Sequence, residues 1–198
     1  MQGSIFIPDI TGFTNFVNSV KPDLGVYVIR KLLNEIIINN PLDIQLSEIE
    51  GDAILYFKPG KPIGIEQILQ GLQKMSKAFD RKYRHLKNKH CLGSEMSLKF
   101  VVHYGNITVY KIAGFISLYG EAVIESHRLL KNGAGLTNYV LITEDYFKAL
   151  NVSATELPLQ KLNYNYCSSK TFEGLRTLSY YFFDCVPQKT AQKSWARA

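Results

Sequence analysis

The chain has 198 residues, of which 46% are hydrophobic and 20% charged, and its net charge is +6. This length fits one well-buried domain and leaves no room for a second of ordinary size, and the composition is that of a soluble globular protein. No apolar run reaches membrane-spanning length, and the first predicted strand starts so close to Met1 that we expect no signal peptide and no membrane partner.

In chain order, the first half predicts a strand, a helix, a hairpin and a long helix. Apolar residues at helical spacing and pairs of alternating runs around Gly51-Asp52 carry this interpretation. The predicted elements are a strand at Ser4–Pro8, a helix at Leu24–Asn39, strands at Leu42–Glu50 and Ala53–Lys58, and a helix at Ile65–Leu86.

The second half predicts a second hairpin, about Gly105-Asn106, and then alternating short elements. These are strands at Met96–His103 and Ile107–Ile112, a helix at Glu121–Lys131, a strand at Tyr139–Thr143, a helix at Glu144–Leu150, and strands within Leu159–Tyr166 and Thr177–Cys185.

This order predicts an α+β fold with a ferredoxin-like βαββαβ core, helices on one face of a largely antiparallel sheet, and a strand-rich C-terminal extension. We expect one domain over residues 1–186, with the core at about 4–150, the extension at about 151–186, and a basic, disordered tail at 187–198.

The cysteines indicate the compartment. Cys91, Cys167 and Cys185 are odd in number and unclustered, which is typical of free thiols in a reducing environment. We therefore predict a cytoplasmic protein.

Two aspartates are the candidate functional residues. Asp9 follows an apolar run in FIPDITGFTNF, where it is either a helix cap or a metal ligand. Asp52 lies at the predicted hairpin tip in EIEGDAILYF, where a Gly-Asp turn is the alternative. Because the first and third strands of a ferredoxin-like sheet are neighbours, both carboxylates can face one space, and oxygen ligands there favour Mg²⁺ or Mn²⁺.

Three segments resemble the catalytic domain of class III adenylate and guanylate cyclases, in a divergent bacterial branch of that superfamily. They are FIPDITGFT, EIEGDAILYF, and VVHYGNITVY followed by LYGEAVIESHRLL, and they span Ser4 to Gly133. The resemblance implies a purine nucleoside triphosphate as substrate, Mg²⁺ or Mn²⁺ as cofactor, and a head-to-tail homodimer with active sites at the interface.

The resemblance also implies roles for individual residues. Arg128 would be a catalytic residue that donates to phosphate across the dimer interface, so that it meets the two aspartates only in a dimer. The other implied residues are Asp9, Asp52 and Ile10 for metal, Thr11, Gly12, Phe13 and Thr14 for phosphate, and Glu48 and Ser117 for the base. A carboxylate at Glu48 favours guanine, because it can accept hydrogen bonds from N1 and the 2-amino group; an exposed strand glutamate is the alternative.

Two features depart from the cyclase pattern. Ile124 stands where the family has a transition-state asparagine, and isoleucine cannot donate a hydrogen bond. The expected triphosphate lysine is also missing near the C-terminal strands, where Lys170 and Arg176 are the nearby candidates and Glu173 occupies the matching position.

Three functions stay open on the sequence. The first is a nucleotidyl cyclase acting on GTP or ATP, and the second is a catalytically degenerate nucleotide- and metal-binding or interaction module of the same fold. The third, RNA binding by the basic segment Lys74–His90, lacks an aromatic-basic signature and is disfavoured. His90-Cys91 has no second ligand pair for zinc, and we expect His103 to satisfy a buried hydrogen bond.

Overall fold

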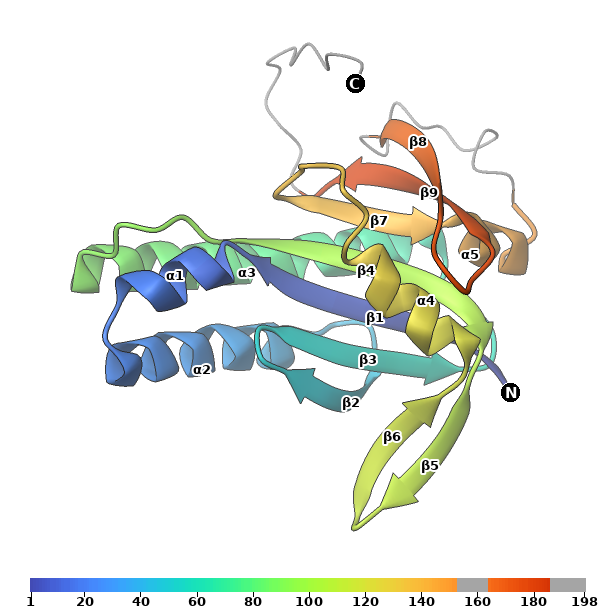
Figure 1. Cartoon of the computed structure of the whole chain (residues 1–198), viewed down its shortest axis with the longest axis horizontal. Helices are drawn as coiled ribbons and strands as arrows, with labels where there is room; N and C mark the ends of the chain where they lie inside the picture. Colours follow the sequence, from blue (N-terminus) through green and yellow to red (C-terminus); the bar gives the residue numbers. More distant parts are fainter. Residues whose placement is uncertain (153–163, 186–198) are drawn as a thin grey trace.

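The computed structural model describes residues 1–152 and 164–185 (Figure 1). The helices are α1 (Phe13–Ser19), α2 (Pro22–Ile38), α3 (Ile65–His90), α4 (Glu121–Leu129) and α5 (Glu144–Ala149). The strands are β1 (Gln2–Thr11), β2 (Gln45–Glu50), β3 (Ala53–Pro59), β4 (Ser97–Asn106), β5 (Thr108–Ile112), β6 (Phe115–Tyr119), β7 (Tyr139–Thr143), β8 (Tyr164–Thr171) and β9 (Thr177–Asp184).

Seven strands form one sheet in the order β2-β3-β1-β4-β7-β9-β8. Among the described strands of this sheet, β4 and β7 pair in parallel and the other neighbours are antiparallel. The placement of β1 beside β3 and the strands β8 and β9 at the far edge confirm the predicted α+β fold with a strand-rich extension (Figure 1).

Strand β1 does not end at Pro8, as predicted, but continues through Asp9 to Thr11. Its pairing with β4 is continuous, whereas its ladder with β3 skips residues 7 and 8 and resumes in the same register at Asp9 and Ala53. Proline has no N–H to donate to a strand ladder. Pro8 is therefore tolerated in the central strand β1 because the ladder with β3 is interrupted there. Asp9 consequently lies inside the sheet, between Ala53 of β3 and Lys99 of β4.

Helices cover both faces of the sheet, which corrects the prediction that they share one face. Phe6 and Ile10 of β1 pack in the core beneath α2 and α3, whereas Ile5 and Ile7 pack in a second core with Leu129 of α4. Strands that are apolar on both sides need cover on both sides. Asp9 alternates with Ile5 and Ile7, so its side chain lies on the α4 face.

The predicted hairpin of β4 with β5 is wrong. Strand β4 is flanked by β1 and β7, which leaves no edge for β5, and β5 pairs instead with β6 in a separate two-stranded ribbon. Ala113 and Gly114 at its turn both have positive φ, as a two-residue type I′ turn requires. The ribbon projects away from the body of the molecule (Figure 1).

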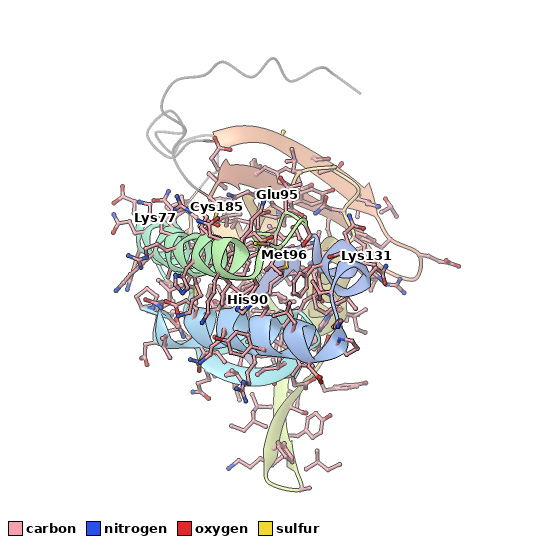
Figure 2. All side chains as sticks on the ribbon, turned by 90° about the vertical axis from the view of Figure 1, so that its left-hand side faces the viewer. Lys77, His90, Glu95, Met96, Lys131 and Cys185 are labelled. Carbon is pink, nitrogen blue, oxygen red and sulfur yellow. The ribbon has the colours of Figure 1, made fainter. Side chains whose placement is uncertain are left out.

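Most other boundaries differ from the predictions by a few residues, but β8 continues to Thr171, well past the predicted end at Tyr166, and β6 was not predicted. Helix α3 runs to His90 instead of ending at Leu86, and its side chains fill the space toward α2 and the sheet (Figure 2). Cys91, Cys167 and Cys185 are free, as expected. The predicted strand residues 159–163 and the tail 187–198 lie outside the described residues. Within residues 1–152 and 164–185, no helix is both long and apolar enough to cross a membrane.

Candidate functional site

The fold brings Asp9 and Asp52 to one place. Asp9 comes from the central strand β1, and Asp52 from the turn between β2 and β3. The Ile10 N–H donates to the backbone carbonyl of Asp52 over 3.3 Å, which fixes this turn against the end of β1. The two aspartates that the sequence singled out therefore face a common space.

The carboxylate of Asp52 is held in an unfavourable environment. Burial, repulsion from the Asp9 carboxylate and a hydrogen bond with it raise the pKa of Asp52 to about 6, although Lys99 acts in the opposite direction. Negative charge at this position is thus costly until a cation approaches.

The chain itself supplies one such cation, Lys99, which was not predicted from the sequence. The Lys99 ammonium lies 3.0 Å from Asp9 Oδ2, and it also donates to the carbonyl of Leu130 over 3.3 Å. Lys99 alternates with the buried Val101 and His103 in β4. A lysine on the inward face of a central strand was the available signal, because such a side chain needs an acidic partner.

The two aspartates form part of a pocket of about 640 Å³ between the sheet and α4. Its charged lining residues are Asp9, Glu50, Asp52, Lys99, His127, Arg128 and Lys131. Arg128 also lines this pocket within the single chain, and its predicted role across a dimer interface stays a prediction. Ile124 also lines it and is 51% exposed.

The pocket fits a divalent cation that arrives with a phosphate ligand. Among the described residues no group of three or more His, Cys, Asp and Glu side chains could hold a metal. Mg²⁺, however, is commonly bound by one or two carboxylates together with substrate phosphates and water, which matches Asp9 and Asp52. Ile10 can contribute only backbone atoms, because its side chain is buried in the opposite core.

The predicted phosphate loop is built around Gly12. Gly12 has φ +88°, and a Cβ there would collide with the backbone carbonyl oxygen of Glu95, so only glycine fits. Thr11 Oγ1 is buried and has no hydrogen-bond partner in the described part of the chain. None of residues 11–14 is among the lining residues of the aspartate pocket, and Phe13 lines a different groove, formed by α1, α2 and β2.

The two predicted base-selecting residues are in direct contact. The hydroxyl of Ser117 in β6 donates to Glu48 Oε1 in β2 over 3.0 Å, and Ser47 Oγ donates to the carbonyl of Ile116 over 3.3 Å. The ribbon is thereby attached to the sheet edge. The pair lies outside the lining of the aspartate pocket of the same chain.

A second polar cluster lies on the same face, and we call it the closed cluster because its charged groups contact one another. Glu125, Asp145 and Arg176 of this cluster also line a separate pocket of about 380 Å³. His103 is fully buried and contacts Glu125 at 2.8 Å and Thr143 at 2.9 Å, which confirms that it satisfies buried hydrogen bonds. Arg176 forms two hydrogen bonds each to Glu125 and Asp145. Burial raises the pKa of Glu125, but the hydrogen bonds from His103 and Arg176 outweigh it and leave that pKa below its ordinary value.

The two candidates for a triphosphate-binding cation are engaged elsewhere. Arg176 belongs to the closed cluster, and Lys170 donates to the carbonyls of Lys131 and Asn132 over 3.1 and 3.3 Å. Neither side chain lines the aspartate pocket.

The fold is that of class III adenylyl and guanylyl cyclase domains. The crystal structure of the guanylyl cyclase Cya2 matches with a TM-score of 0.75 at 15% identity, covering 96% of this chain and 94% of that one. The adenylyl cyclase CyaB from P. aeruginosa matches with a TM-score of 0.67 at 16% identity, covering 96% and 97%.

Sequence comparison shows the family to which the chain belongs. The model of a family described as "Protein of unknown function (DUF2652)" matches residues 29–139, and the chain belongs to this family. It is also similar to the uncharacterized protein Rv2561/Rv2562 of Mycobacterium tuberculosis, at 27% identity over 161 residues, which is 77% of this chain and 71% of that protein.

Proposed function

We propose that the protein is a nucleotidyl cyclase that binds a purine nucleoside triphosphate with Mg²⁺ or Mn²⁺ at the Asp9–Asp52 pocket. The observation that carries this proposal is the convergence of Asp9, Asp52 and Arg128 on one pocket in a cyclase-type fold. Asp9 and Asp52 would hold the cation, which would neutralise phosphate charge and lower the pKa of the attacking hydroxyl.

The reaction is an intramolecular displacement. The ribose 3′ oxygen forms a bond with the α-phosphorus, the bond to the β-phosphate oxygen breaks, and pyrophosphate and the hydroxyl proton leave. Arg128 contributes by hydrogen bonding to phosphate oxygens as they gain charge. Most of the catalysis would come from orientation and charge neutralisation at this pocket.

Glu48 would select guanine. Its Oε1 accepts from Ser117, which orients the carboxylate and leaves other lone pairs for the N1–H and 2-amino groups of the base. Since the pair lies outside the aspartate pocket of its own chain, it would serve the pocket of a second copy.

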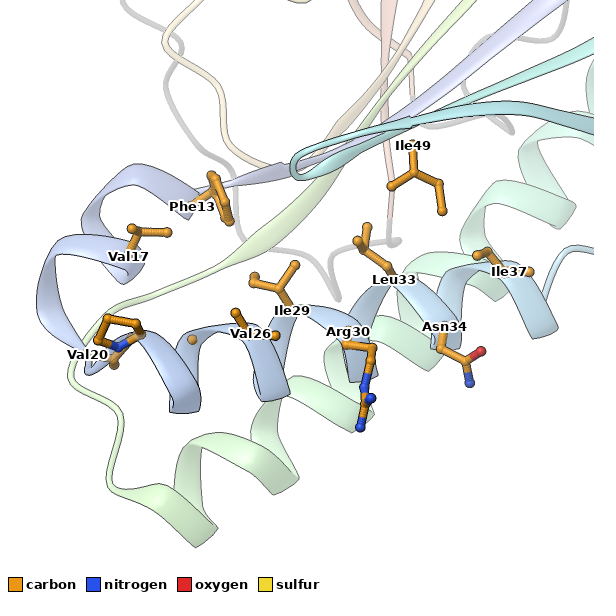
Figure 3. Close-up of a pocket in the computed structure, with 12 residues that line it drawn as sticks. Phe13, Val17, Val20, Val26, Ile29, Arg30, Leu33, Asn34, Ile37 and Ile49 are labelled. Atoms are coloured by element: carbon orange, nitrogen blue, oxygen red, sulfur yellow. The ribbon is translucent and has the colours of Figure 1, made fainter. Parts of the chain in front are cut away.

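Two exposed apolar surfaces support that second copy. One is a groove of about 590 Å³ formed by α1, α2 and β2, in which Val17, Val26 and Ile49 face the same space (Figure 3). The other is the β5–β6 ribbon, where Ile112 and Phe115 are 63% and 74% exposed. Because the surfaces differ, a twofold dimer can place each ribbon in the partner's groove. Phe115→Asp should therefore halve the mass measured by light scattering, whereas Lys111→Gln on the same ribbon should not.

Turnover should be slow. Ile124 supplies no hydrogen bond at the pocket wall, and loss of one preorganised donor costs about 10²–10³ in rate. The same substitution favours the second candidate function, metal-dependent nucleotide binding without chemistry.

The test is incubation of the protein with Mn²⁺ and either GTP or ATP, followed by chromatography of the nucleotides. We expect a cyclic monophosphate and pyrophosphate, more from GTP than from ATP, and no product with Asp52→Ala. If the nucleotide stays intact but still binds in the presence of Mn²⁺, the proposed cyclase activity is overturned and the nucleotide-binding module remains. If no nucleotide binds, both proposals are overturned.

A further inference from the structure

The charges of the aspartate pocket are only partly paired. Lys99 pairs with Asp9, and His127 lies 3.6 Å from Glu50. Among the ion pairs of the described residues, Arg128 and Lys131 have no acidic partner, although both line the pocket. Two free cations therefore face the carboxylates across the pocket.

Lys131 lies close to Arg128 in the chain, and its backbone is held by hydrogen bonds. It follows Arg128 by three residues, just beyond the end of α4 at Leu129, and its N–H donates to the Arg128 carbonyl over 3.0 Å. This turn brings the two residues to the same wall of the pocket, which both line. The residue is exposed, and Figure 2 shows it on the opposite side of the molecule from Lys77.

The backbone around Lys131 is held from two strands. Lys170 of β8 donates to the carbonyls of Lys131 and Asn132, and Lys99 of β4 donates to the carbonyl of Leu130. These ammonium groups stabilise the carbonyl end of α4, where cations are favourable, and they fix the chain from which the Lys131 side chain extends.

We propose that Lys131 binds the terminal phosphates of the nucleotide, with Lys170 as the positioning residue that holds its backbone. The inference rests on the proposed function and adds a phosphate-binding residue to the same pocket. A lysine suits this role because its ammonium is a mobile point charge that can follow β- and γ-phosphate oxygens, while Arg128 binds nearer the α-phosphate.

The charge balance supports the assignment. Lys99 already pairs with Asp9, and His127 lies near Glu50, so little of the negative charge of the pocket is left for Arg128 and Lys131 to neutralise. A nucleoside triphosphate adds negative charge that a single divalent cation cannot fully offset. Arg128 and Lys131 supply two positive charges that no other group of the described pocket uses. The selectivity expected from this arrangement depends on phosphate number: loss of Lys131 should matter for a triphosphate and not for a monophosphate.

The experiment is calorimetric titration of GTP, GDP and GMP in the presence of Mn²⁺. Lys131→Gln should weaken GTP binding about tenfold, GDP binding less, and GMP binding not at all, as expected for one charge-assisted contact. Lys131→Arg should retain GTP affinity, and Lys77→Gln, an exposed lysine on α3, is the matched control.

The positioning role has its own variant. Lys170→Met should weaken GTP binding about threefold with GMP binding unchanged, and Lys170→Arg should restore it; a general loss of stability would lower affinity for all three nucleotides alike. Equal affinities of wild type and Lys131→Gln for GTP would overturn the inference and leave the proposed function standing. Failure of the wild-type protein to bind any of the three would overturn the proposed function as well.

Discussion

Two charged clusters border helix α4, and they differ in how completely their charges are paired. In the closed cluster, Glu125 Oε1 accepts from Arg176 at 2.7 Å, and Oε2 contacts both His103 and Arg176. In the aspartate pocket, Asp52 faces another carboxylate, and Arg128 lacks an acidic partner among the described ion pairs.

This difference indicates which charged residues stabilise the fold and which remain available to bind a ligand. A buried carboxylate that is hydrogen-bonded on both oxygens, as Glu125 is, is engaged by its own partners, and its removal leaves them uncompensated. An accessible pocket with unpaired charges of both signs can instead bind a ligand that carries both, and a metal-bound phosphate is the ligand that we propose. Variants of the two clusters should therefore behave differently.

The largest expected effect is the loss of stability when the carboxylate of Glu125 is removed from the closed cluster. Glu125→Leu leaves the buried His103 without its carboxylate and Arg176 with Asp145 alone, and we expect it to reduce the free energy of unfolding by about 3–5 kcal/mol. Urea denaturation measures this. Arg128→Leu, on the exposed side of the same helix, should change it by no more than about 0.5 kcal/mol; similar losses for both variants would contradict the contrast.

The next effect concerns the pocket wall. Ile124→Asn restores a hydrogen-bond donor beside Arg128, and we expect the rate of cyclic nucleotide formation to rise by about 10²–10³. Initial rates with Mn²⁺ and GTP measure it, and Ile124→Gln, with a longer side chain, is the control. An unchanged rate would show that the missing donor is not what limits turnover.

Base preference should respond to Glu48. Glu48→Lys replaces an acceptor with a donor, so the ratio of GTP to ATP affinity should fall at least about tenfold. Ser117→Ala removes only the orienting hydrogen bond to Glu48 and should change the ratio less. Competition binding with both nucleotides distinguishes these outcomes; a constant ratio in Glu48→Lys removes that residue from base recognition.

The smallest effect is a pH-dependent change in stability. The pKa of Asp52 in the folded protein, about 6, lies above its ordinary value of 3.8, so ionisation of Asp52 destabilises the metal-free fold. That penalty is absent below about pH 4 and complete above about pH 6–7. Asp52→Asn should therefore raise Tm by a few degrees at pH 8 and leave it unchanged at pH 4. An equal shift at both pH values would rule out ionisation of Asp52 as the cause.

Local patterns predicted most of the elements, because each strand or helix is largely specified by its own residues, but they did not predict β6 and placed β8 too early in the chain. The apolar stripe of α3, with Ile68, Leu72, Met75 and Phe79, is buried as its spacing indicates. The adjacency of β1 and β3 followed from the element order, and it was enough to place Asp9 near Asp52. The end of β1 was predicted too early, at Pro8, because a proline is tolerated in a central strand where one ladder is interrupted.

Long-range partners could not be predicted. In the sequence, Lys170 and Arg176 are only cations near a late strand, whereas their partners lie at Lys131 and Glu125, far away in the chain. Whether β5 pairs with β4 or with β6 depends on which edges β1 and β7 leave open, and that is a property of the assembled sheet. For Lys99, the place on an inward strand face signalled that an acidic partner was needed, but only the assembled sheet shows that this partner is Asp9.

The most direct test of the pocket is its affinity for a divalent cation. Electron paramagnetic resonance of free Mn²⁺ during titration measures binding to wild type, Asp9→Asn, Asp52→Asn and the control Asp43→Asn, a residue in the loop before β2. We expect saturable binding to wild type and to Asp43→Asn, and strong loss in the two pocket variants. Equal binding by all four proteins would contradict the assignment of Asp9 and Asp52 as metal ligands.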